Sequence, residues 1–328
     1  MEESKKEKGE ALEQDYGTAF GLEDGGELGF KKTLKSILDD FKSLNYRFLI
    51  PIGKIFSSKL LRKKAVRWVL LFGLLPLVFF QFHAWFKLTF EEIIWLIQTY
   101  FVLFWALYFY SVIKPDSNVW KRAIGYALFT AFIGIPLLLI SQKLPIIQNL
   151  YASTYSGDLL TRSLGFVFGV GLLEETYKAL PLIIFGLRKG KIKNLKDATF
   201  LGLMSGFGFA TAEGVQYTIS ATVSAQMYNY FSEQFMQFLF RIMTGPILHG
   251  AWAGTVGWFI GVAAVRSDKR WQIIFIGILS MAILHGLYDI FAGTIWGILL
   301  AGFTFLVFMA YLTHDQNEEI NEKREFSK

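Results

Sequence analysis

Apolar runs of about 20 residues recur along this chain from about residue 66 almost to its end, and they constrain its fold more than any other feature. About 20 helical residues are needed to cross the ~30 Å of hydrocarbon in a bilayer. No separate stretch of core-forming size remains beside these runs. The sequence therefore predicts an integral membrane protein of the all-α class, a polytopic bundle of transmembrane helices in a lipid bilayer.

The apolar runs divide the chain into three parts. Residues 1–60 form an N-terminal segment, residues 61–312 the transmembrane domain and residues 313–328 a C-terminal tail. Apolar side chains at helical spacing over 30–60 predict either a helix on the membrane surface or a solvated helix packed on a loop. About eight spans are expected, at approximately 66–86, 92–113, 122–141, 160–187, 197–222, 237–264, 271–291 and 293–312.

Basic clusters predict how the chain is oriented. The clusters KLLRKKAVR, KRA, RKGKIKNLK and RSDKR adjoin the first, third, fourth and sixth spans. All of them fall on one side if the N-terminus is cytoplasmic, as the preference of Lys and Arg for that side requires. Loops on the other side, such as SATVSAQMYNYFSEQ, are nearly free of Lys and Arg. We therefore expect a multi-pass protein of an inner or plasma membrane with both termini in the cytoplasm.

Charge and cysteine content exclude several classes of function. The 328-residue chain has a formal net charge of +6, but its Lys and Arg residues sit mainly beside apolar runs, where they determine topology. We therefore expect no nucleic-acid partner. The chain has no cysteine, which excludes disulfides, a thiolate nucleophile and a Cys-ligated metal. Any metal would need histidine and carboxylate ligands.

Ionisable residues inside four of the predicted spans are the candidates for function. The stretch GLLEETYKALPLIIFGL at 171–187 carries Glu174, Glu175 and Lys178. Charges at membrane depth are costly, so a chain that keeps three of them together is expected to use them. At 1.5 Å per residue, the depths of these positions are compatible with one layer of the bilayer. The other spans contribute Glu213, His249, His285 and Asp289.

Small residues on the same helices predict close packing. A stripe at i, i+4 spacing lies beside Glu213, and a second set follows His249 along its helix. Such stripes let helix backbones approach one another, and packing alone is their commonest use. They therefore predict contact between these helices without indicating chemistry. The two sets are Gly202, Gly206, Ala210 and Gly214, and Gly250, Gly254, Gly257 and Gly261.

Each polar residue also has a purely structural explanation. Glu174 and Lys178, at i and i+4, are placed for an ion pair that would merely neutralise charge. Glu175 points about 100° away around the helix, and this pairing leaves it without a partner. His285 and Asp289 share a face, where the carboxylate would orient the imidazole. We favour the functional interpretation because the histidine-bearing helices adjoin the glutamate-bearing ones.

These residue types, without a Cys or a Gly-flanked Ser nucleophile, suit the activation of water. A carboxylate takes a proton from water, and a histidine stabilises the oxyanion or protonates the leaving group. Alternatively, His249, His285 and one or two glutamates, Glu213 among them, would bind Zn²⁺ and leave a position for water. Both routes hydrolyse an acyl bond. The chain has no HExxH motif, so a metal-dependent and a metal-free mechanism both stay open.

Four motifs together carry a family resemblance. EETYK at 174–178 resembles EExxK, FATAE at 209–213 resembles FxxxE, His249 resembles an isolated third-motif histidine, and HGLYD at 285–289 resembles HxxxD. In this order they resemble the PrsW family of intramembrane proteases, related to the CAAX-prenyl and bacteriocin-processing protease superfamily. The motifs span a core of about 160–291. The first spans and the N-terminal segment lie outside it.

The resemblance implies a CAAX-protease-like core and an intramembrane endopeptidase that cuts membrane proteins. We expect Glu174 or Glu175 to activate the attacking water. It assigns catalytic or metal-binding roles to Glu174, Glu175, Glu213, His249 and His285, with Lys178 and Asp289 in support. It also implies a membrane-protein substrate, and characterised relatives include a protease that cuts a membrane-anchored anti-sigma factor. Zinc is the cofactor to expect on the metal route, and no cofactor on the other.

Two further classes of function use the same residues differently. A proton- or cation-coupled transporter would bind its ion at the intramembrane carboxylates. No internal repeat pairs the two halves of the chain, which weakens this interpretation because many transporters are built from such repeats. A membrane scaffold or immunity-type protein with a decayed site is the third class, and the polar positions on every core helix argue against it.

Overall fold

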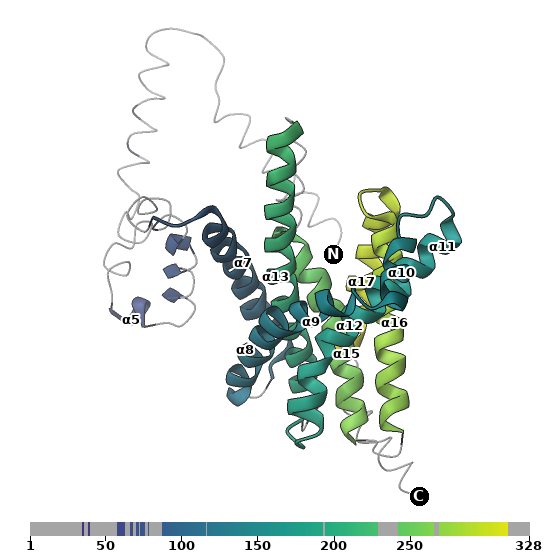
Figure 1. Cartoon of the computed structure of the whole chain (residues 1–328). Helices are drawn as coiled ribbons and strands as arrows, with labels where there is room; N and C mark the ends of the chain where they lie inside the picture. Colours follow the sequence, from purple (N-terminus) through teal and green to yellow (C-terminus); the bar gives the residue numbers. More distant parts are fainter. Residues whose placement is uncertain are drawn as a thin grey trace, which may run out of the picture. The chain divides into compact units, whose positions relative to one another are not determined.

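The computed structural model describes residues 87–313 of the chain, apart from 116, 193, 229–241 and 266–268 (Figure 1). Before residue 87 it describes scattered positions, among them helix α5 (Ser58–Leu61). The chain divides into two units, residues 1–76 and 77–328. The predicted surface helix over 30–60 and the predicted span over 66–86 lie mostly outside the described residues.

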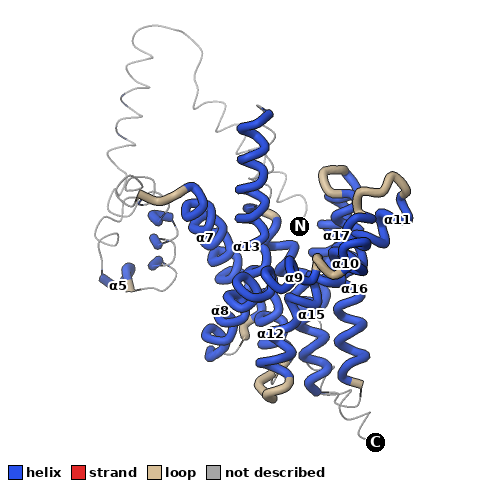
Figure 2. The backbone as a smooth tube through the Cα atoms, viewed as in Figure 1, coloured by secondary structure: helices blue, strands red, loops and turns tan. Residues whose placement is uncertain are grey.

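Every regular element of the described part of the second unit is a helix (Figure 2), which confirms the predicted all-α class. The elements are α7 (Phe90–Ile113), η1 (Ser117–Val119), α8 (Trp120–Phe129), η2 (Thr130–Gly134), α9 (Ile135–Ser141), α10 (Pro145–Ser153), α11 (Leu159–Leu164), η3 (Gly165–Gly171), α12 (Leu172–Pro181), η4 (Leu182–Leu187), α13 (Leu195–Tyr228), α15 (Gly245–Val265), α16 (Arg270–Phe291) and α17 (Ile295–Thr313).

Five helices of the described chain are long and apolar enough to cross a membrane. They are α7, the continuous rod of α8, η2 and α9, and helices α15, α16 and α17. The predicted spans over 160–187 and 197–222 are also helical, over residues 159–187 and 195–228, but do not belong to these five. A multi-pass membrane protein is therefore confirmed, whereas the total of eight spans stays a prediction.

Local sequence signals explain where several helices begin. Helix α7 starts at a capping box, in which the Glu92 amide donates to Thr89 Oγ1 at 3.3 Å and the Thr89 amide donates to Glu92 Oε2 at 2.7 Å. Helix α10 starts at Pro145, whose fixed φ suits a first turn. Helix α11 starts after Asp158, whose Oδ2 accepts from the Thr161 amide at 2.8 Å. This hydrogen bond holds the pKa of the Asp158 carboxyl below its usual value.

The predicted span over 237–264 begins outside the described residues and is interrupted where the structure first describes it. Residues 242–243 are helical, Thr244 forms a turn, and helix α15 begins anew at Gly245. Pro246 follows Gly245, and proline is tolerated in the first turn of a helix because the amides there have no helical acceptor. His249 consequently lies about 6 Å from the start of α15, closer to the end of its helix than the prediction placed it.

Close contacts between backbones join α13 to α15 and the rod over 159–187 to α16. A methyl group on Gly206 would collide with the carbonyl oxygen of His249, and one on Gly202 with that of Ala253. A methyl group on Gly171 would collide with the carbonyl oxygen of Ala282. The small-residue stripe therefore brings helices together as predicted, and it places the motif-bearing helices at contact distance.

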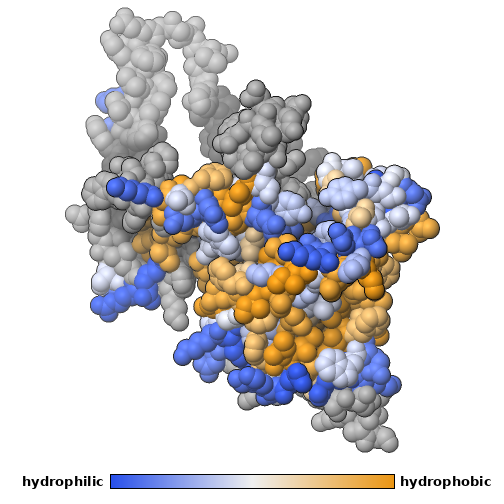
Figure 3. Space-filling view, in the orientation of Figure 1, coloured by the Kyte–Doolittle hydropathy of each residue, from blue (hydrophilic) through white to orange (hydrophobic). Residues whose placement is uncertain are grey.

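The surface of the second unit matches a bilayer. On the face shown in Figure 3, apolar residues form a belt across its middle, and hydrophilic residues border this belt at both ends. Large apolar side chains on α9 and α17 are exposed, among them Ile140, Ile298 and Leu306. An apolar belt of this kind removes its area from water only when lipid covers it.

Candidate active site

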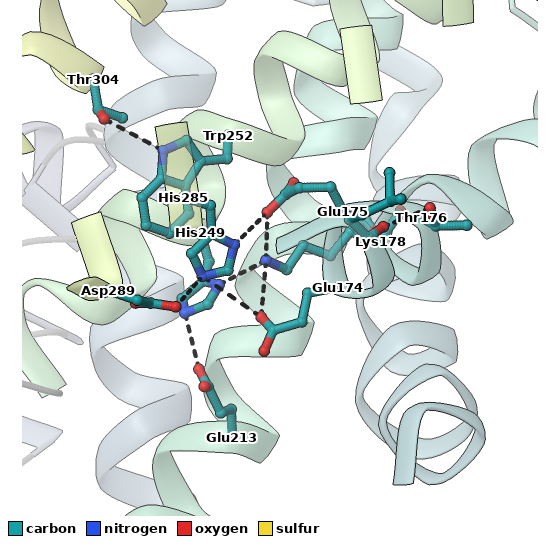
Figure 4. A network of polar contacts seen from close by, with 12 residues as sticks. Glu174, Glu175, Thr176, Lys178, Glu213, His249, Trp252, His285, Asp289 and Thr304 are labelled. Atoms are coloured by element: carbon teal, nitrogen blue, oxygen red, sulfur yellow. Dashed lines mark hydrogen bonds and ion pairs between the residues drawn. The ribbon is translucent and has the colours of Figure 1, made fainter. Parts of the chain in front are cut away.

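The predicted site residues meet in one cluster (Figure 4). Helix α12 supplies Glu174, Glu175 and Lys178, and the other members come from three separate helices, α13, α15 and α16. The side chains of α12 in this cluster are buried. The expectation that residues far apart in the sequence meet in one layer therefore agrees with the geometry. The members from the other helices are Glu213, His249, His285 and Asp289.

Lys178 is the centre of the cluster. Its Nζ lies 2.7 Å from Glu175 Oε1, 3.5 Å from Glu174 Oε2 and 2.8 Å from His249 Nδ1. The predicted pair of Glu174 and Lys178 is present, but the prediction that Glu175 lacks a partner is wrong. At 100° per residue, positions i−3 and i−4 lie on either side of Lys178, so its long side chain reaches both carboxylates.

The His249 ring joins Lys178 to Glu213. Its Nδ1 faces the Lys178 Nζ, and its Nε2 lies 2.8 Å from Glu213 Oε2. An ammonium only donates hydrogen bonds, so opposite a charged Lys178 the Nδ1 accepts and the Nε2–H donates to Glu213. With its hydrogen on Nδ1 instead, the ring offers a lone pair at Nε2, and Lys178 must then accept as a neutral amine.

The His285 ring faces three carboxyl groups. Its Nδ1 lies 3.0 Å from Glu175 Oε1, while its Nε2 lies 3.5 Å from Asp289 Oδ2 and 3.8 Å from Glu174 Oε2. The predicted pair of His285 and Asp289 is present, although the shorter contact belongs to Glu175. Donation from Nδ1–H to the Glu175 carboxylate leaves a lone pair on Nε2 of the neutral ring. That lone pair points toward Glu174 and Asp289.

Aromatic rings enclose the cluster, namely Phe209, the first residue of the FxxxE motif, and Trp252, which lies outside every motif. Trp252 stacks on His285 with ring centroids 4.1 Å apart and an angle of 16° between the planes. Phe209 covers Lys178, with Nζ 4.4 Å from its ring centroid. Each lies one helical turn from an ionisable site residue, because Trp252 follows His249 by three positions and Phe209 precedes Glu213 by four. For Trp252 this spacing was the signal available in the sequence.

A cavity of about 330 Å³ opens beside the cluster. Five of the site residues line it, but Glu175 and Lys178 do not. Glu174 is therefore the carboxyl group of the EE pair that faces the cavity, and Glu175 lies behind it. Burial, with a contribution from the Glu174 carboxyl, raises the pKa of Tyr151 in the cavity wall. The five residues are Glu174, Glu213, His249, His285 and Asp289.

The cavity lies toward one end of the helices. Its wall includes Tyr155 in the connection before α11, Gly245 at the start of α15 and Ala292 after the end of α16. The basic loop over 188–194 directly precedes the first residue of α13. Its last residue, Asn194, lies 19 residues before Glu213 of the cavity wall. At 1.5 Å per residue that separation is about 28 Å along the helix. The cavity and the basic loop therefore belong to opposite ends of the bundle.

Three residues of the described chain have the donor atoms and spacing of a metal site. Ligand atoms of Glu174, His249 and His285 lie within 4.8 Å of one another. Two imidazoles and one carboxylate are a donor set of catalytic zinc sites, which keep a fourth position for water. The predicted set was His249, His285 and one or two glutamates, Glu213 among them. In this cluster Glu174 is the carboxylate that groups with the two rings, and Glu213 as a ligand stays a prediction. Glu213 contacts the His249 ring.

Comparison with known proteins agrees with this geometry. A family model described as "PrsW family intramembrane metalloprotease" matches residues 118–314, more than half of the chain. The chain belongs to the PrsW family. It is therefore a peptidase, and the family indicates intramembrane protease activity. Protease PrsW of Shouchella clausii (strain KSM-K16) is 24% identical over 184 residues, which cover 56% of this chain and 77% of that relative. No solved structure matches.

The matched segment of this PrsW family member contains all four motifs and helices α8 to α17. Helix α7 precedes the segment, yet it packs against α13, where a methyl group on Gly214 would collide with the Gln98 side chain. Helix α17 carries no motif but lies inside the segment. The family assignment thus covers the whole candidate site and the helices that support it.

Proposed function

We propose that this chain hydrolyses peptide bonds of membrane proteins inside the cavity beside α12, with water activated by its carboxyl groups. The observation that carries the proposal is the convergence of Glu174, His249 and His285 within 4.8 Å on the wall of that cavity. A cavity of about 330 Å³ has room for a short stretch of peptide and a water molecule. The proposed substrate is a membrane protein, and an anti-sigma-factor-like protein is one candidate.

Glu174, His249 and His285 would hold a divalent cation such as Zn²⁺. When bound, the ion would supply a Lewis acid toward a water molecule and the scissile carbonyl group. Support comes from the donor set and from charge, because the four carboxyl groups of the cluster face the single amino group of Lys178. With the ion bound through His249 Nε2, the ring hydrogen would sit on Nδ1 and Lys178 would be a neutral amine. A site with an excess of carboxyl groups favours a cation.

Glu213 is proposed as the general base. It lines the cavity, and its Oε2 lies 2.8 Å from His249 Nε2, beside the proposed position of the water. As the water oxygen bonds to the carbonyl carbon, Glu213 takes one of its protons. The proton then passes to the amide nitrogen, the carbon–nitrogen bond breaks, and an acid and an amine leave. Glu175 is assigned a supporting role because it lies behind the cavity and contacts Lys178 and His285.

The bond that is cut is proposed to lie near the outer membrane surface. The cavity belongs to the end of the bundle opposite the basic loop, and basic loops face the cytoplasm. A plasma or inner membrane with both termini in the cytoplasm is the matching localisation. In this arrangement residues 1–60 and 313–328 stay cytoplasmic, and residues 61–312 form the transmembrane domain. A substrate would present its outer juxtamembrane stretch to the cavity.

The direct test is cleavage of single-span membrane proteins by detergent-purified protein, together with elemental analysis. Glu174→Gln and His285→Ala should no longer contain near-stoichiometric zinc, and their rate of cleavage should fall by at least about 100-fold. Glu213→Gln should keep zinc and lose cleavage to a similar extent, because it removes only the base. Glu91→Gln, the same chemical change at an exposed residue of α7, is the matched control and should behave like the parent.

Three outcomes would count against parts of this proposal. Undiminished cleavage by Glu174→Gln and His285→Ala would remove the cavity from the reaction. Metal-free parent protein that cleaves at its full rate, and stops with Glu174→Gln, would make Glu174 the base and exclude the metal. Ion-dependent solute flux in liposomes without cleavage of any substrate would support a transporter.

A further inference from the structure

The stack of Trp252 on His285 extends to a residue outside every motif. The Trp252 indole N–H donates to Thr304 Oγ1 on helix α17, at 3.3 Å. Trp252 is 1% exposed and Thr304 2% exposed, so the hydrogen bond is excluded from water and lipid. Helix α17 is otherwise apolar over most of its length and carries no Asp, Glu, Lys, Arg or His between Ile295 and Thr313. Thr304 is thus a buried polar group aimed at the site.

These contacts restrain the His285 ring in two different ways. The 3.0 Å contact of Nδ1 with Glu175 Oε1 limits rotation within the plane of the ring, because it fixes where Nδ1 lies. The indole face restrains the plane itself, because a turn of the imidazole about its Cβ–Cγ bond would drive a ring edge into the stacked indole. Together they aim Nε2 at Glu174 and the cavity.

Thr304 restrains the Trp252 ring in turn. An indole in an apolar core has one polar atom, and a hydrogen bond to that atom selects one orientation of the ring. Figure 4 shows Thr304, Trp252 and His285 in this order, leading toward the carboxyl groups of α12. Trp252 also contacts the edge of His249, with centroids 5.4 Å apart and planes at 87°. One indole therefore touches both histidines.

We propose that Trp252 and Thr304 are positioning residues for the hydrolytic site, which hold His285 with its Nε2 directed at Glu174. This inference rests on the proposed function of the cavity. It gives helix α17 a part in catalysis, although that helix supplies no group that touches the substrate. It also explains why a tryptophan occupies the position one turn after His249, where a smaller apolar residue would fill the helix contact without covering His285.

The test compares kcat and KM for one cleaved membrane substrate among four variants. Trp252→Leu removes the stack, and Trp252→Phe keeps a ring without the N–H. Thr304→Val removes the hydroxyl, whereas Thr304→Ser keeps it. We expect kcat to fall about tenfold or more for Trp252→Leu, because small displacements of a catalytic group are costly. For Thr304→Val, kcat should fall a few-fold, whereas Thr304→Ser should keep a kcat close to that of the parent. KM should stay within about twofold of the parent value in all four variants.

Phe308→Leu is the matched control. Phe308 lies one turn after Thr304 on α17, is 1% exposed, and packs on Phe109 and Gly254 rather than on a histidine. It should lower the melting temperature and leave kcat unchanged. If Phe308→Leu reduced kcat as much as Thr304→Val, general packing would explain the effect and the inference would be wrong. In a Trp252→Phe background, Thr304→Val should have no further effect, because the N–H is already gone.

The outcomes separate this inference from the function on which it rests. If Glu174→Gln and His285→Ala abolish cleavage while folded Trp252→Leu and Thr304→Val keep the parent kcat, the positioning role is overturned and the proposed function stands. If the variants of Glu174 and His285 also cleave normally, the proposed function itself has failed. Should Trp252→Leu not fold, the pair Thr304→Val and Thr304→Ser decides, since Val has the shape of Thr without its hydroxyl and Ser has the hydroxyl without the methyl group.

Discussion

The least obvious residue of the site is Lys178. An ammonium buried in an apolar core costs several kcal/mol unless it is paired and hydrogen-bonded. Here one carboxylate lies at 2.7 Å and a second at 3.5 Å, so the charges offset one another within a single turn of α12. The same Nζ contacts His249, which joins this helix to α15. Lys178 therefore connects the two halves of the candidate centre and is more than a neutralising partner.

Replacing Lys178 tests whether its ammonium group offsets the buried carboxylates. Lys178→Met leaves Glu175 buried beside His285 without its ammonium partner, and we expect unfolding to become easier by about 3 kcal/mol. The double variant Lys178→Met with Glu175→Gln removes both charges and should regain much of that loss. Cleavage should be absent in both variants. Thermal unfolding in detergent, with cleavage measured in parallel, checks this, and a double variant no more stable than the single one would contradict the charge balance.

The identity of the site residues was predictable from the sequence, but their partners were not. Charged residues in apolar runs are rare enough to stand out, so Glu174, Glu213 and His285 could be named before any geometry. Which carboxylate meets which ring depends on the rotation of each helix about its axis, and spacing within one helix does not contain that rotation. For this reason the spacing could not indicate that the Glu174 carboxylate, rather than that of Glu213, lies within 4.8 Å of a nitrogen of each histidine ring. Apolar Trp252 gave no such signal.

At the scale of the elements, glycines determine which helices can touch. Gly171 ends the η3 segment just before the EE pair, and its α-carbon packs against the backbone of Ala282 on α16. His285 follows Ala282 by three residues, on the same face of α16. The contact at Gly171 therefore sets the separation between Glu175 and His285. Gly171, one turn before Glu175, thus controls the distance between two residues of the candidate site.

A single methyl group at this contact should be damaging. Gly171→Ala would place its Cβ against the Ala282 carbonyl oxygen and force α16 away from α12, at a cost of about 1–3 kcal/mol. Gly125→Ala, on an exposed face of α8 with open space around the added atom, is the matched control. It should be neutral or slightly stabilising, because alanine favours a helix. Equal melting temperatures for the two variants would refute the close-contact explanation.

Long apolar helices were easier to predict than short ones. The ends of α7, α16 and α17 lie within about two residues of the expected spans, because a run of about 20 apolar residues has few other solutions. Helix α10 went unpredicted, since nine residues cannot cross a bilayer and give only a weak periodic signal. The interruption at Thr244 was missed because the apolar run continues through it. Both features border the cavity, where the fold departs from simple spans.

For the whole molecule, the relation between the cavity and the membrane sides decides what can be cleaved. The absence of native cysteine makes this relation measurable, because a single introduced thiol is then the only one in the chain. Tyr155 is 90% exposed in the connection that borders the cavity, and Lys189 is exposed in the basic loop. These two positions report on opposite ends of the bundle.

We expect a membrane-impermeant thiol reagent to label Tyr155→Cys in intact, right-side-out membrane vesicles and to label Lys189→Cys only after the vesicles are opened. The reason is that Lys and Arg in short loops are retained on the cytoplasmic side. Lys143→Cys, in the connection before α10, should behave like Tyr155→Cys and guards against an effect of one site alone. Labelling of Lys189→Cys in sealed vesicles would show that the orientation is opposite to the one proposed. The cavity would then face the cytoplasm, and the substrate would have to present its inner juxtamembrane segment instead.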